Sequence, residues 1–166
     1  MNAQTITRRG FFIYFLPIND SNASPHLTVL GQINDVNNQG FKKLLETVNK
    51  ADFANKPIHA SLAETDYFGK NNEFEVVRLN SNKELQELHK SLLKITEDSG
   101  YEIMQPQYSG ENYNPHISLS KNFTEAQLRE AHEKDGIAID SIVLKESLFN
   151  SAGEFISSEL IGSLKL

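Results

Sequence analysis

The sequence predicts an α+β fold in which helices cover two largely antiparallel sheets. Segments of strand character and of helix character alternate irregularly, which is typical of this class. A chain of 166 residues is long enough for one domain with a substantial core. One short motif occurs twice, once in each half of the chain. We therefore expect residues 1–166 to form a single domain of two intertwined lobes that face one central cleft.

Five elements are expected in the first half of the chain. Phe11–Leu16 is rich in aromatic and β-branched residues and is predicted to be a buried strand. A second strand begins at the first copy of the motif and closes at Gly31. Apolar residues at helical spacing predict a helix from about Gln39 to Ala51. Alternating apolar residues predict two further strands, at Pro57–Leu62 and Phe74–Leu79.

The second half begins with the most regular helical pattern. Ser81 and Glu84 have the spacing of a capping box. An apolar stripe follows toward Gly100, formed by Leu85, Leu88, Leu92 and Ile95. Thr124, followed at capping-box spacing by a glutamine, predicts the start of a third helix that ends before Gly136.

Two strands are predicted to close the chain. They cover Ile137–Leu148 and Phe155–Leu166, with a turn between them at residues 150–153. No linker between the predicted elements is long enough to separate independent domains, which agrees with a single folded unit.

Composition limits the class of partner. The formal net charge is −6 and no run of basic residues is present, whereas proteins that grip long nucleic acids neutralise several phosphates with Lys and Arg. A small nucleotide in a pocket is therefore favoured over a long polymer. The lack of cysteine excludes a thiol nucleophile and fits the cytoplasm. The apolar run near the N-terminus is too short to span a membrane, so no membrane partner is expected, and we expect a monomer.

The repeated motif reads histidine, aliphatic, hydroxyl, aliphatic, and follows a proline in both copies. The first copy is His26–Val29 and the second is His116–Leu119. Alternate side chains of a strand point to the same face, so each copy would project its histidine and its hydroxyl together, with its aliphatic residues in the core. The predicted catalytic residues are His26, Thr28, His116 and Ser118.

Two imidazoles and two hydroxyls in one cleft suit the chemistry of a phosphodiester. A neutral imidazole accepts a proton from the attacking water or hydroxyl, and a protonated imidazole on the opposite side donates one to the leaving oxygen. The hydroxyls donate hydrogen bonds to the non-bridging oxygens. The same residues make a poor ligand set for zinc, so no metal is expected. The sequence does not assign the acid and the base.

The paired motifs resemble those of the 2H phosphoesterase superfamily, which contains 2′,5′ RNA ligase-like proteins and cyclic phosphodiesterases. The likeness extends to the proline before His116, to Phe68–Gly69 and to the closing segment around Ile142–Leu144. The resemblance implies a bilobal fold with pseudo-twofold symmetry and a metal-independent mechanism without a cofactor. It also implies small substrates, such as 2′,3′-cyclic phosphates and 2′,5′-linked oligonucleotides.

The expected function is therefore a metal-independent phosphodiesterase that acts on a small cyclic or 2′,5′-linked nucleotide. Phage members with similar motifs cleave the cyclic oligonucleotide signals of bacterial defence, and this activity is one alternative. A nucleotide-binding module that has lost turnover is another, although two intact motifs argue against it.

Aromatic residues near the motifs are candidates for contact with a base, because aromatic faces are good platforms for nucleobases. The candidates for substrate binding are Tyr14, Tyr108 and Tyr113, followed by Tyr67 and Phe68. His59 is expected to be a structural residue of a strand. His89 and His132 are expected on the surface of helices.

Overall fold

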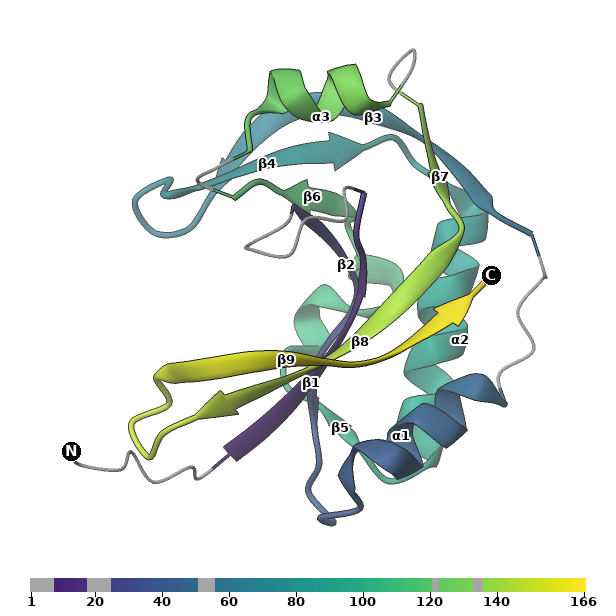
Figure 1. Cartoon of the computed structure of the whole chain (residues 1–166), viewed down its shortest axis with the longest axis vertical. Helices are drawn as coiled ribbons and strands as arrows, with labels where there is room; N and C mark the ends of the chain where they lie inside the picture. Colours follow the sequence, from purple (N-terminus) through teal and green to yellow (C-terminus); the bar gives the residue numbers. More distant parts are fainter. Residues whose placement is uncertain (1–7, 18–24, 51–55, 121–122, 133–135) are drawn as a thin grey trace.

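The computed structural model describes residues 8–17, 25–50, 56–120, 123–132 and 136–166. Within them the strands form one curled, antiparallel sheet with helices on its outside (Figure 1). The elements in chain order are β1 (Arg8–Phe15), β2 (His26–Asn34), α1 (Gly40–Asn49), β3 (Ile58–Phe68), β4 (Phe74–Leu79), α2 (Lys83–Asp98), β5 (Glu102–Ile103), η1 (Pro106–Tyr108), η2 (Gly110–Asn112), β6 (His116–Ser118), α3 (Glu125–Ala131), β7 (Gly136–Ile139), β8 (Ser141–Phe149) and β9 (Phe155–Lys165).

The strand order explains how the two halves of the chain meet. It runs β7-β3-β4-β6-β2-β1-β8-β9, with β5 paired to β2. The α+β class is confirmed. The two predicted sheets are continuous with each other, because β6 pairs with β4 on one side and with β2 on the other. The pseudo-twofold symmetry stays a prediction.

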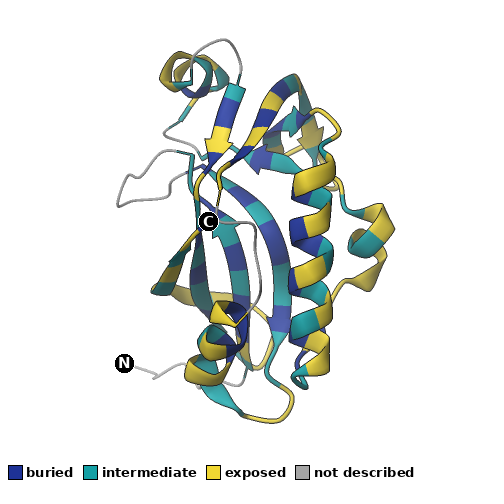
Figure 2. Cartoon of the chain, turned by 90° about the vertical axis from the view of Figure 1, so that its right-hand side faces the viewer, coloured by how far each residue is buried: buried dark blue, intermediate teal, exposed yellow. Residues whose placement is uncertain are grey.

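The core lies between the sheet and the helices. Helix α2 buries Leu85, Leu88 and Leu92, and buried positions alternate with less buried ones along the strands beside it (Figure 2). The N-cap of α2 is Asn82, whose side chain accepts a hydrogen bond from the Leu85 N–H, and not Ser81 as predicted. The Asn82 amide also donates to the His59 carbonyl at 2.7 Å, which ties the start of the helix to β3. The capping box at Thr124 is confirmed.

Three strands extend further than the sequence predicts, and the first of them, β1, begins at Arg8 and not at Phe11. Strand β2 continues past Gly31 to Asn34 and β3 continues to Phe68. Gly31 does not end its strand but admits a close approach, because a Cβ atom there would lie 2.5 Å from the Phe12 ring. Strand β3 extends through a polar stretch because it pairs with β4 over that length, with Phe68 opposite Phe74.

The predicted strand Ile137–Leu148 is two strands. Strand β7 pairs with β3, whereas β8 pairs with β1 and β9 at the other end of the sheet. The phase of burial changes where they meet: Ile137 and Ile139 are buried, and then Ile142 and Leu144. No helix in the described residues is long and apolar enough to cross a membrane.

Candidate active site

The two motifs lie side by side on neighbouring strands. Strands β2 and β6 pair antiparallel, with His26 opposite Ser118 and Leu27 opposite Ile117. Leu27 and Ile117 are fully buried, so the alternate positions of both strands point to the other face of the sheet. Continuing this register sets Thr28 across from His116. The four predicted catalytic side chains therefore share one small area of one face.

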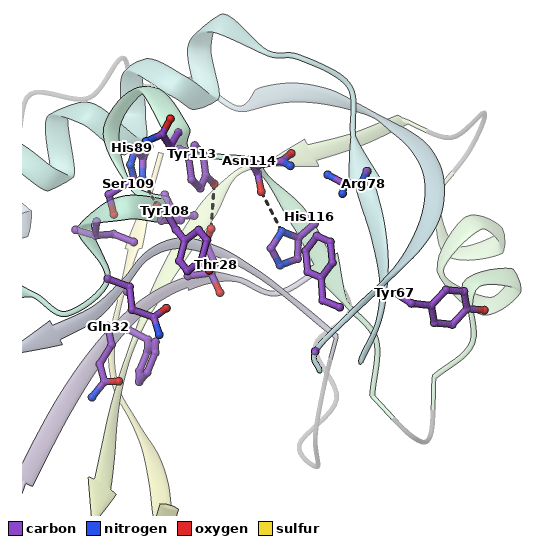
Figure 3. A pocket seen from close by; sticks show the side chains of 18 residues that line it. Thr28, Gln32, Tyr67, Arg78, His89, Tyr108, Ser109, Tyr113, Asn114 and His116 are labelled. Carbon is purple, nitrogen blue, oxygen red and sulfur yellow. Dashed lines mark hydrogen bonds between the residues drawn. The ribbon is translucent and has the colours of Figure 1, made fainter. Parts of the chain in front are cut away.

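A cavity of about 860 Å³ opens over this face (Figure 3). Thr28 and His116 line it, together with residues of η1, η2 and the β3–β4 hairpin. His26 and Ser118 are not among the lining residues, since they lie two positions from Thr28 and His116 on the same strands, beyond the edge of the cavity. The structure thus brings the four together by strand pairing, while the cavity itself takes one residue from each motif.

The His116 ring is held in one orientation. Its Nδ1 donates to the Asn114 carbonyl at 2.9 Å, which leaves Nε2 as the acceptor nitrogen. The Phe68 ring meets the imidazole edge-on at 4.8 Å between centroids. Burial lowers the pKa of His116, the bond to Asn114 opposes this change, and the nearby Arg78 charge adds to it. The free site therefore favours a neutral His116.

His26 has a different neighbourhood. Its ring packs on Tyr14, with 4.6 Å between the ring centroids. Tyr14 pairs with Thr28 in the strand register and stacks on Phe12 at 5.5 Å. Burial raises the pKa of the Tyr14 hydroxyl, so Tyr14 stays neutral at physiological pH. The Nζ of Lys145 lies 5.9 Å from the centre of the Tyr14 ring.

Arg78 is a residue of this site that sequence reasoning missed. It lies directly opposite His116 on β4 and lines the cavity. Its guanidinium bonds to Asp66 and lies 5.1 Å from the centre of the Phe68 ring. The sequence does contain a signal for a paired arginine, because Arg78 interrupts the apolar residues of the strand Phe74–Leu79. A charged residue inside an apolar strand usually has a partner.

His89 was also misjudged, because it is buried and not on the surface. Its Nδ1 donates to the Val29 carbonyl at 2.7 Å, and its Nε2 accepts from the Gly110 N–H at 2.9 Å. Tyr113 stacks on the same ring at 3.9 Å and donates its hydroxyl to the Thr28 carbonyl at 3.0 Å. The segment that leads to the second motif is thereby tied to the first motif through α2.

The remaining candidates lie in different settings. Tyr108 and Tyr113 both line the cavity, where Tyr108 is largely exposed and Tyr113 is partly buried by the contacts just described. Tyr67 also borders the cavity, but its ring points away from His116 (Figure 3). His59 is exposed on β3. His132 follows the end of α3, with Nε2 at 3.0 Å from the Pro17 carbonyl. In the described part of the chain, no three His, Asp or Glu side chains gather as a metal site, and metal independence stays a prediction.

Comparisons with known proteins show the family of the chain and structures with a similar fold. The family model of the 2′-5′ RNA ligase superfamily matches residues 5–135. Among solved structures, a phosphoesterase is similar with a TM-score of 0.60 and 16% identity, over 98% of this chain and 99% of that chain. E. coli LigT, solved with NADP+, is similar with a TM-score of 0.56 and 18% identity, over 96% and 98% of the chains. The protein TT0787 of Thermus thermophilus has a TM-score of 0.59 and 14% identity, over 95% and 97%. A search of curated protein sequences finds no match.

Proposed function

Because the chain belongs to the 2′-5′ RNA ligase superfamily, we propose that it is a metal-independent phosphodiesterase for a small cyclic or 2′,5′-linked nucleotide. Membership supports a phosphoesterase-type enzyme, and the choice of reaction and substrate rests on the residues of the site. One observation carries the proposal, namely the antiparallel pairing that sets His26 opposite Ser118. It gives two imidazoles and two hydroxyls that can share one phosphate.

In this mechanism His116 is the base. Its Nδ1 donates to the Asn114 carbonyl, so Nε2 is ready to accept the proton of an attacking water or sugar hydroxyl. A bond forms between that oxygen and phosphorus while the bond to the leaving oxygen breaks. Protonated His26 donates its proton to the leaving oxygen. The two histidines then return to their starting forms by proton exchange with water.

The hydroxyls of Thr28 and Ser118 bind the non-bridging oxygens of the phosphate. Charge accumulates on these oxygens in the transition state, and hydrogen-bond donors held there in advance stabilise it. His26 and His116 transfer the protons, whereas the two hydroxyls stabilise the negative charge on the phosphate oxygens. Loss of a histidine should therefore be more severe than loss of a hydroxyl.

A second candidate substrate is a cyclic oligonucleotide, as in the phage enzymes that degrade bacterial defence signals. The cavity has a volume of about 860 Å³, in the upper part of the range for small-molecule sites. This volume favours a ligand as large as a cyclic oligonucleotide. Solved structures of the similar E. coli LigT contain 3′-AMP and phosphate, which supports a nucleotide ligand.

The test is turnover with a chelator present. The wild-type protein is incubated in EDTA with adenosine 2′,3′-cyclic phosphate, 2′,5′-linked diadenylate and 3′,5′-cyclic diadenylate. We expect cleavage of at least one of them, and a loss of about 10²- to 10⁴-fold in His26→Ala and in His116→Ala. His59→Ala, which removes an exposed histidine, should retain full activity. Activity that requires added metal, or that survives either histidine substitution, would refute the mechanism. Binding without product would indicate a silent nucleotide-binding module.

A further inference from the structure

Arg78 is a charged residue of the cavity that the proposed mechanism leaves unused. It is the one Lys or Arg among the described residues that line the cavity. Only 25% of its side chain is exposed. A guanidinium presents a planar fork of donors that matches the oxygens of a phosphate. Its position in a nucleotide-sized cavity therefore indicates a phosphate ligand.

The strand order fixes the side of His116 on which Arg78 lies. Arg78 on β4 pairs with His116 on β6, and β6 in turn pairs with β2. Arg78 therefore lies on the flank of His116 away from Thr28, one strand spacing of about 4.8 Å further out. Figure 3 shows the same order, with His116 between Thr28 and Arg78. A phosphate between the two histidines lies on the Thr28 side, so Arg78 faces another part of the substrate.

The guanidinium is oriented with one edge available. Asp66 Oδ2 accepts from Arg78 Nε at 2.7 Å and from Nη2 at 2.5 Å, and the Phe68 ring supports the plane of the group. The Tyr67 N–H and Arg78 lower the pKa of Asp66, so this carboxylate stays ionised. In the part of the chain that the structure describes, no hydrogen bond reaches Nη1 of Arg78. Asp66 thus holds the arginine in place and leaves Nη1 for a ligand.

We propose that Arg78 binds a second phosphate of the substrate, which lies beyond the reacting phosphate on the His116 side. This inference rests on the proposed function and narrows its substrate class. It favours a nucleotide that carries two phosphate groups, such as a 5′-phosphorylated 2′,3′-cyclic nucleotide or a short oligonucleotide. A nucleoside whose single phosphate is the reacting one lacks a group for Arg78.

The first experiment measures binding and does not depend on turnover. Adenosine 2′-monophosphate and adenosine 2′,5′-bisphosphate form a matched pair, and their affinities are measured by calorimetry. The wild-type protein should bind the bisphosphate about 10- to 100-fold more tightly, as expected for hydrogen bonds to a charged group. Arg78→Gln should lose this preference, and Arg78→Lys should keep part of it, because a lysine keeps the charge without the fork.

The matched control is Arg9→Gln. Arg9 is an exposed arginine that also pairs with a carboxylate, that of Glu146, but it does not line the cavity. This variant should keep the wild-type preference. Thermal unfolding of each variant shows whether it is folded, and the lysine variant keeps the test valid where the glutamine variant is unstable. Equal affinity of the wild-type protein for the two nucleotides would overturn the proposal. Equal weakening of both nucleotides by Arg78→Gln would also overturn it, since the arginine would then bind the reacting phosphate.

The second experiment separates this inference from the proposed function. Turnover of adenosine 2′,3′-cyclic phosphate is compared with turnover of its 5′-phosphorylated form. A higher kcat/KM for the phosphorylated form that disappears in Arg78→Gln supports both. Turnover of neither form, together with an Arg78-dependent preference in binding, refutes the proposed function and retains the arginine site. Turnover of both forms with the same kcat/KM refutes the inference and retains the proposed function.

Discussion

The two histidine motifs share a sequence pattern and a sheet face but not a neighbourhood. His26 lies at the start of the nine-residue strand β2 and packs on Tyr14. His116 lies on the three-residue strand β6, with Phe68 at its edge and Arg78 beside it. The repeated motif therefore sets where the imidazoles project, whereas burial and the nearby Arg78 charge lower the pKa of His116. The different neighbourhoods support our proposal that one histidine acts as the base and the other as the acid.

The largest expected effect tests whether the two motifs act as one site. Each single histidine variant should lose about 10²- to 10⁴-fold in kcat/KM. The double variant His26→Ala/His116→Ala should be within about tenfold of the slower single variant, because groups that act in one step are not additive. The measurement is kcat/KM for the best substrate of the panel. Losses that multiply would mean that the two histidines act independently.

Substitutions of the two hydroxyls test the two motifs separately and have a smaller expected effect. Thr28→Val and Ser118→Ala each remove one donor to the phosphate while keeping the strand. Each should lower kcat by about 10- to 100-fold, as expected for a hydrogen bond to a charged group. The loss should be similar for the two motifs, since the register sets both hydroxyls on one face. A loss confined to one variant would show that one motif alone holds the phosphate.

The pH profile tests the asymmetry itself. Burial lowers the pKa of His116, the Asn114 carbonyl opposes this change, and Arg78 lowers the pKa further. Arg78→Gln removes the last contribution, so the pKa rises. Because His116 acts in its neutral form in the proposed mechanism, the acidic limb of log kcat/KM should move to higher pH. The measurement spans about pH 5 to 8, with Arg9→Gln as the control that leaves the limb in place. A shift to lower pH would contradict this account of His116.

The smallest expected effect concerns stability and the contacts that join the two motifs. Burial lowers the pKa of His89 from 6.5, the Val29 bond opposes this change and Lys90 adds to it. The unfolded chain then takes up this proton more readily than the folded one, so the free energy of unfolding should fall as the pH drops below 6.5. Denaturant unfolding of His89→Gln should show a weaker dependence on pH than the wild-type protein. A dependence on pH in His89→Gln that is identical to that of the wild type would contradict the buried, neutral His89.

The sequence predicts the elements of the site better than its surroundings. His26 and His116 could be paired from the sequence because a repeated motif is independent of the fold around it. An arginine within the strand Phe74–Leu79 indicates a partner, but its place beside His116 depends on the register between β4 and β6, which no local pattern reveals. His89 was misjudged for a related reason. Helical spacing alone does not show that both of its ring nitrogens find backbone partners in distant segments.

In the fold as well, some elements could be predicted from local patterns and others could not. Strong local signals, such as the capping box at Thr124, are confirmed. The split of residues 137–148 into β7 and β8 was missed, although the buried positions change phase between Ile139 and Ile142. A change of phase in an alternating pattern marks a strand that turns its other face to the core. Here it marks the point at which the chain leaves one end of the sheet for the other.

A crystal structure with adenosine 2′-monophosphate bound would show directly whether both motifs bind one phosphate. We expect Nε2 of His26 and Nε2 of His116 both to lie within about 3.2 Å of oxygens on the same phosphorus. The hydroxyls of Thr28 and Ser118 should bind the remaining oxygens. A phosphate bound by only one histidine, with the other ring turned away from it, would contradict the account.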